Sequence, residues 1–78
     1  MTQQEIKDYT ASITLSIFAE LYGHLSDSDI GCDVSDQSVT ITVYNDDIDE
    51  LIELLWMENM TCEVFTKHNQ TTTFTVNQ

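Results

Sequence analysis

Basic residues are almost absent from this chain of 78 residues, which has 2 Lys and Arg against 14 Asp and Glu and a formal net charge of −12. The electric field of this negative charge repels nucleic acid and anionic membranes, so we expect no direct binding to nucleic acid and none to membranes. It attracts basic surfaces instead. The chain also has no proline and only 2 glycines, so no flexible linker is indicated.

Cysteine is scarce as well. The 2 cysteines are too few for a disulfide scaffold. The N-terminus has no net positive segment of the kind that opens a secretory signal, and the apolar stretch from Ala11 to Tyr22 is too short to span a bilayer. We therefore expect a cytoplasmic protein whose thiols are reduced.

The chain is nevertheless rich in apolar residues, with 41% hydrophobic and 9% aromatic residues. This composition is too apolar for a disordered acidic tail, and the acidic residues are dispersed among the apolar runs. We expect one folded acidic domain over residues 1–78, with a radius of gyration of about 12 Å.

The first segment has the pattern of an amphipathic helix. Thr2 and Glu5 have the spacing of a capping box, in which the threonine hydroxyl accepts a hydrogen bond from the glutamate amide. Gly23 is a plausible C-terminal stop. Residues recurring at steps of three and four predict a helix over roughly residues 3–23: Ile6, Thr10, Ile13, Ile17 and Leu21.

Period-two alternation predicts strands at residues 30–34, 39–44, 62–67 and 72–76, joined in pairs by polar turns. In the third strand the two faces are Cys62, Val64 and Thr66 on one side and Glu63, Phe65 and Lys67 on the other.

A second helix is expected from Asp46 to Glu58, with Asp47 as N-cap and Glu50 as its capping-box partner. The order α-β-β-α-β-β predicts an α+β fold with a four-stranded, mainly antiparallel sheet and two helices packed on one face. The other face meets water, and threonines are expected on it together with Tyr44 and Phe65.

The acidic face of the second helix is the leading candidate site. Asp46, Asp49, Glu50 and Glu53 share one side, and Asp47 and Glu58 flank it. Steps of three or four residues separate carboxylates by about 5–6 Å along the axis, on the scale of phosphates along a DNA strand. A rigid row of carboxylates can therefore stand in for phosphates against a Lys/Arg groove, although a solvated helix face has the same pattern.

With these features the chain resembles the small acidic DNA-mimic inhibitors that phages and mobile elements encode against restriction, repair or CRISPR enzymes. The resemblance lies in composition: the acidic run from Asp46 to Glu53, the near absence of Lys and Arg, and a second acidic group at Asp27, Asp29, Asp33 and Asp36. It implies a protein that occludes the basic nucleic-acid-binding surface of a target protein.

An apolar docking patch is possible beside the acids, formed by Trp56, Met57 and Met60 with Tyr44 and Phe65. Residues of these types are more often part of the core. If exposed, they would anchor an interface, and we include Trp56 among the partner-binding residues.

Metal binding and catalysis have little support. Counted from Asp27, Gly31 falls at position five instead of the position six that an EF-hand loop requires. The set Cys32, Cys62, His24 and His68 lacks the paired cysteine spacing of a zinc site. A disulfide between the two cysteines requires neighbouring strands. With no nucleophile elbow, phosphate loop or glycine-rich fingerprint, we expect no metal, no cofactor and no enzyme.

Three functions remain open. The first is an inhibitor that imitates DNA. The alternative is an acidic chaperone or adaptor, monomeric or homodimeric, that binds a basic polypeptide through a groove or a sheet edge; type III secretion chaperones are similar in size class and acidity. The third is a structural subunit whose charge only confers solubility.

Added neutral salt should raise the melting temperature, because screening weakens the repulsion among exposed carboxylates. The Debye length falls from about 30 Å at about 0.01 M salt to about 3 Å at about 1 M. Thermal unfolding followed by circular dichroism over this range measures the effect, and a melting temperature that falls steadily with salt would contradict the prediction.

Overall fold

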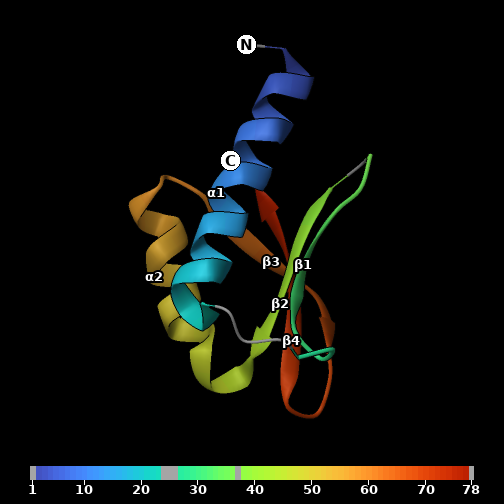
Figure 1. Cartoon of the computed structure of the whole chain (residues 1–78), viewed down its shortest axis with the longest axis vertical. Helices are drawn as coiled ribbons and strands as arrows, with labels where there is room; N and C mark the ends of the chain where they lie inside the picture. The colour runs from blue at the N-terminus through green and yellow to red at the C-terminus, as the bar shows by residue number, and fades with distance from the viewer. Residues whose placement is uncertain (1, 24–26, 37, 78) are drawn as a thin grey trace.

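The computed structural model of the chain describes residues 2–23, 27–36 and 38–77. The elements follow the order α1 (Gln3–Tyr22), β1 (Gly31–Val34), β2 (Val39–Tyr44), a 3-10 turn (Asn45–Asp47), α2 (Ile48–Met57), β3 (Thr61–Lys67) and β4 (Thr71–Asn77). The α+β fold with two helices and a four-stranded antiparallel sheet is therefore confirmed (Figure 1). Its radius of gyration is 11.7 Å.

The strands lie in the order β1-β2-β4-β3, and every neighbouring pair is antiparallel. The two hairpins therefore meet through β2 and β4 at the centre of the sheet. Strand β1, with 4 residues, and strand β3, with 7 residues, form the two edges. Both helices lie on the same side of the sheet (Figure 1).

The core lies between the helices and the sheet. Strand β2 alternates buried and half-buried residues along its whole length, as the sequence predicts. Helix α2 places Leu51 and Leu55 against this face. The buried hydrophobic cluster consists of Ile17, Ile41, Val43, Leu51, Leu55, Met60, Phe74 and Val76.

Helix α1 begins and ends where its sequence signals lie. The Glu5 amide donates to the Thr2 hydroxyl at 3.2 Å, and Gly23, at φ +60°, donates its amide to the Ala19 carbonyl. Thr14 is fully buried, and its hydroxyl donates to the Thr10 carbonyl at 2.7 Å. This bond within the helix satisfies the buried hydroxyl, so threonine can occupy the packed face.

The start of α2 differs from the prediction. Asp47 makes no side-chain capping bond, and its backbone (φ −103°, ψ 2°) is not extended as an N-cap residue usually is. Its Oδ2 instead accepts a hydrogen bond from the Tyr22 hydroxyl at 2.8 Å. The predicted capping box of Asp47 and Glu50 is therefore wrong, because a partner on α1 takes the carboxylate and a 3-10 turn leads into the helix.

Strand β3 contains a bulge that the period-two alternation of its sequence does not reveal. The register shifts between Val64 and Thr66, so that Val64 lies opposite Phe74 while Thr66 lies opposite Thr73. Adjacent residues of β4 point to opposite faces, so Thr66 leaves the face of Val64. Lys67 correspondingly joins the helix-covered face. The predicted placement of these two residues is wrong, since one extra residue reverses the alternation.

The face away from the helices carries threonines, as expected, and the Thr42 and Thr73 hydroxyls lie 2.7 Å apart across two strands. Tyr44 departs from the prediction. Its ring packs edge-on against Tyr22 of α1, with ring centroids 5.8 Å apart, and does not stand free on the open face. The Tyr22 hydroxyl accepts a hydrogen bond from the Tyr44 amide at 3.0 Å, which fastens the end of β2 to α1.

Replacing Tyr22 by Phe should cost about 1–2 kcal/mol of unfolding free energy, because it leaves the Tyr44 amide and the Asp47 carboxylate without their common partner. Urea unfolding followed by circular dichroism measures the loss. The matched control is Tyr9→Phe, since the Tyr9 ring is exposed. Equal stabilities of the two variants would show that the Tyr22 hydroxyl bonds contribute nothing.

Candidate partner-binding face

Helix α2 presents an acidic face to solvent because Leu51 and Leu55 fix its rotation. These two side chains are buried against the sheet, and at about 100° per residue Asp49 and Glu53 fall on the opposite side. Asp49, Glu50 and Glu53 are all exposed. The structure therefore brings these three predicted site residues together on one outward surface.

The acidic residues at the two ends of this surface differ in their exposure to solvent. Asp46 is exposed in the 3-10 turn before α2, and Glu58 is exposed just after the helix. Asp47 is only half-buried and is engaged by Tyr22. Burial, reinforced by the neighbouring Asp47 carboxylate, raises the pKa of the Tyr22 phenol above its ordinary value. Asp47 thus serves the fold, while the other acids of the run point to solvent.

The carboxylates of this face lack cationic partners. Within residues 2–23, 27–36 and 38–77 no ion pair is formed, either by Lys7 on α1 or by Lys67 at the end of β3. Asp49, Glu50 and Glu53 also accept no hydrogen bond from the described residues. Their charge is therefore balanced only by solvent ions.

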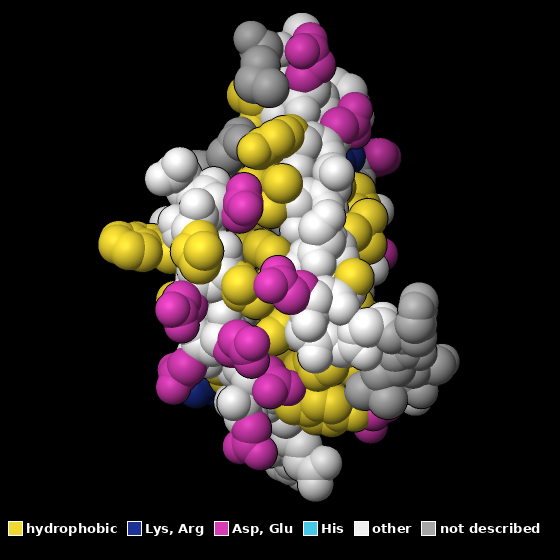
Figure 2. Space-filling view, turned by 60° about the vertical axis from the view of Figure 1, so that its left-hand side comes forward, with side chains coloured by type: hydrophobic (Ala, Val, Ile, Leu, Met, Phe, Trp, Pro, Cys, Tyr) yellow, Lys and Arg dark blue, Asp and Glu magenta, His cyan; other side chains and the backbone are white. Residues whose placement is uncertain are grey.

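Two large apolar side chains continue the acidic face at the end of α2. Trp56 is 75% exposed and Met57 is 70% exposed. The more frequent core assignment is therefore wrong for both, because Met60 fills the core beyond the helix end. In Figure 2 acidic side chains are spread over the face that the helices form, with hydrophobic side chains among them.

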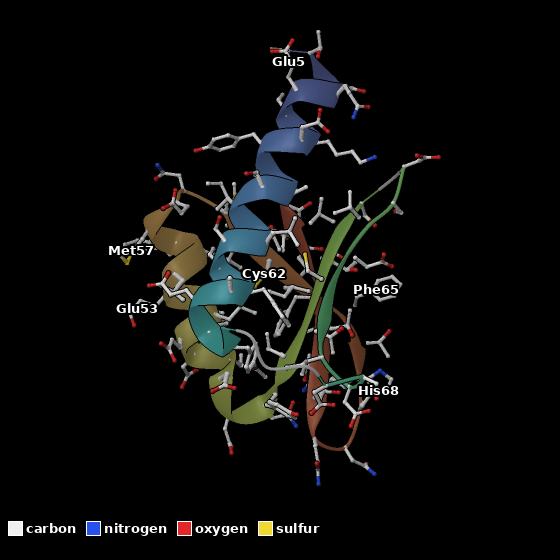
Figure 3. All side chains as sticks on the ribbon, viewed as in Figure 1. Glu5, Glu53, Met57, Cys62, Phe65 and His68 are labelled. Atoms are coloured by element: carbon white, nitrogen blue, oxygen red, sulfur yellow. The ribbon has the colours of Figure 1, made fainter. Side chains whose placement is uncertain are left out.

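The wider apolar patch considered in the sequence analysis does not form as one surface. Phe65 is exposed, but it projects from the opposite side of the molecule to Met57 and Glu53 (Figure 3). Met60 is buried, and Tyr44 packs on Tyr22. At the end of α2 the exposed apolar side chains are therefore Trp56 and Met57.

The second acidic group is dispersed along β1. Asp27 Oδ1 accepts the Asp29 amide at 2.9 Å in the turn before the strand, whereas Asp36 follows its other end. Asp29 and Asp36 line two separate surface pockets, the first beside His68 and the second beside Lys7. Asp33 lies between them on the strand. These four residues form no common site, and the described part of the chain contains no cluster of acidic, His or Cys side chains suited to a metal.

Cys32 and Cys62 are free. They lie on β1 and β3, at opposite edges of the sheet, so the neighbouring strands that a disulfide needs are not present. Burial, together with the charge of Asp33, raises the pKa of Cys32 to about 11, and burial raises that of Cys62. Both thiols are therefore protonated near neutral pH. His24 of the rejected zinc set lies outside the described residues.

Sequence reasoning did not reveal that Ile52 on α2 and Val64 on β3 are half-exposed. Val64 lies opposite the buried Phe74 and so belongs to the core face of the sheet. Alternation alone does not show how far the helices cover that face.

The chain matches no protein-family model, no curated protein and no solved structure. Among the described residues, neither helix has the length and hydropathy to cross a bilayer.

Proposed function

We propose that this protein is a small inhibitor that binds and occludes the basic nucleic-acid-binding surface of a target protein by imitating DNA. The observation that carries the proposal is the α2 face: Asp49, Glu50 and Glu53 are exposed on a rigid helix, and Trp56 and Met57 extend from its last turn. This function needs no cofactor and no chemistry by the chain itself. It suits a cytoplasmic protein of the anti-defence type.

The dimensions of α2 fit such imitation. Its 10 residues extend over about 15 Å, an axial length that holds about four phosphates of one DNA strand. Asp46, Asp49, Glu53 and Glu58 supply carboxylates along and just beyond this length. Because the buried leucines fix the helix, its backbone needs no ordering on binding, and this part of the entropic cost of association is avoided.

Trp56 supplies the aromatic contact surface that a row of carboxylates lacks. Electrostatic complementarity sets the association rate and the partner more than the affinity, while exposed aromatic side chains are frequent hot spots once buried in an interface. The indole is also the best cation–π partner of an Arg or Lys, and basic nucleic-acid grooves stack bases on flat side chains. Trp56 is thus suited to take the place of a base next to the imitated phosphates.

Reversing three charges on α2 should abolish displacement of DNA. The target is first captured from host lysate at low salt and identified, and the chain is then titrated against labelled DNA bound to that target. The variant Asp49→Lys, Glu50→Lys and Glu53→Lys should compete at least about 100-fold less well, because close charge pairs across an interface are replaced by like charges.

The matched control reverses Asp29, Asp33 and Asp36, three exposed acids outside α2, and produces the same change in net charge. It should compete nearly as well as the parent chain. Equal loss in both variants would mean that total charge matters and the α2 surface does not. Normal competition by the α2 variant would refute the proposed site.

Trp56→Ala should weaken binding to the same target about 30-fold or more, as expected for a hot-spot truncation of about 2 kcal/mol. Phe65→Ala is the control, since Phe65 is exposed to a similar extent, 69% against 75%, on the other side of the molecule. Calorimetric titration measures both affinities. If the two alanine variants bind alike, Trp56 is not an anchor.

A further inference from the structure

Strand β3 is a long sheet edge that is left open. Among the described residues it pairs only with β4, whereas the other edge, β1, has just 4 residues. Short edge strands limit pairing with other chains, and long ones invite it. Five of the seven β3 residues are exposed: Thr61, Glu63, Val64, Phe65 and Lys67.

The helix-covered side of this edge is apolar and incompletely covered. Val64 lies opposite the buried Phe74, so it belongs to the core face of the sheet, yet 53% of it is exposed. Ile52 of α2 is half-exposed as well. Helix α2 packs against β3, so each of these two neighbouring elements carries a partly exposed apolar side chain.

Helix α2 packs against both α1 and β3. The side toward α1 is marked at the start of α2 by Asp47, whose carboxylate accepts a hydrogen bond from Tyr22 at 2.8 Å. Ile52 is five residues further along, about 140° around the helix, which turns it away from α1. An extended chain added to β3 would therefore cover Val64 and approach Ile52.

The open side of the same edge is acidic. Glu63 lies opposite Thr75 on the face away from the helices and is exposed. The bulge at Phe65 interrupts the ladder, so residues 61–64 form the regular part of the edge. An added strand would meet an apolar side chain on one face and a carboxylate on the other, in strict alternation.

We propose that residues 61–64 of β3 accept an extended segment of a protein partner in which apolar and basic side chains alternate. Main-chain hydrogen bonds to the free edge hold the segment, its apolar residues cover Val64 and Ile52, and its basic residues lie beside Glu63. Charge favours this occupant over a second copy of the chain, because each copy carries a net charge of −12 and pairing of two such edges opposes like charges. The site is built on β3, and its use does not depend on DNA imitation.

The probe is a short synthetic peptide of alternating lysine and valine. Two peptides of the same composition serve as controls, one with its lysines and valines in two blocks and one with alternate backbone amides methylated. The alternating peptide should bind the intact chain at least about tenfold more tightly than either control, because only it can add a strand. Binding is measured by calorimetry, and amide hydrogen exchange should show added protection in residues 61–64. Equal affinity of the three peptides would show that they bind through charge attraction alone, and would overturn the proposal.

The chain provides matched variants. Val64→Lys should lower the affinity for the alternating peptide at least about tenfold, since a charge on an edge strand opposes strand addition. Val34→Lys should leave it within about twofold, because Val34, 45% exposed, is the corresponding edge valine of β1. Equal effects of the two substitutions would refute the β3 site. So would sedimentation showing a dimer that Val64→Lys dissociates, which would assign the edge to a second copy.

Discussion

The packing of Leu51 and Leu55 against the sheet is the interaction on which the surface of this protein depends. Both side chains are fully removed from solvent, which stabilises the domain by roughly 1.5–3 kcal/mol each through the hydrophobic effect. Because a helix has only one rotation that buries both, the same contact decides what α2 shows to solvent. Asp49, Glu50 and Glu53 point outward as a direct consequence.

Sequence periodicity predicted the elements whose pattern is set locally. Helix α1 carries both its start and its stop in its own residues, and β2 alternates without interruption. The acidic face of α2 was predictable for the same reason, since it is the complement of the leucine positions.

The failures have causes that the local sequence pattern does not show. The Asp47 carboxylate was assigned to a cap because nothing near it reveals the Tyr22 hydroxyl, 25 residues away, to which it binds. The bulge in β3 depends on the register with β4 and has no side-chain signature. Trp56 is exposed because α2 ends one residue later and Met60 occupies the core. The acids around β1 look clustered in sequence, but the 4 residues of that strand alone separate its ends by about 10 Å.

The net charge of −12 has a second consequence, which concerns the open edge of β3. An uncovered strand of 7 residues would normally invite pairing between copies. At physiological ionic strength the Debye length is about 8 Å, shorter than the 11.7 Å radius of gyration, so repulsion between two copies acts mainly as their surfaces approach contact. Over the same short range of separations, the negative charges attract a basic partner. The same charge distribution therefore disfavours pairing of the β3 edge with a second copy and favours its pairing with a basic chain. Neither effect requires a carboxylate to be buried.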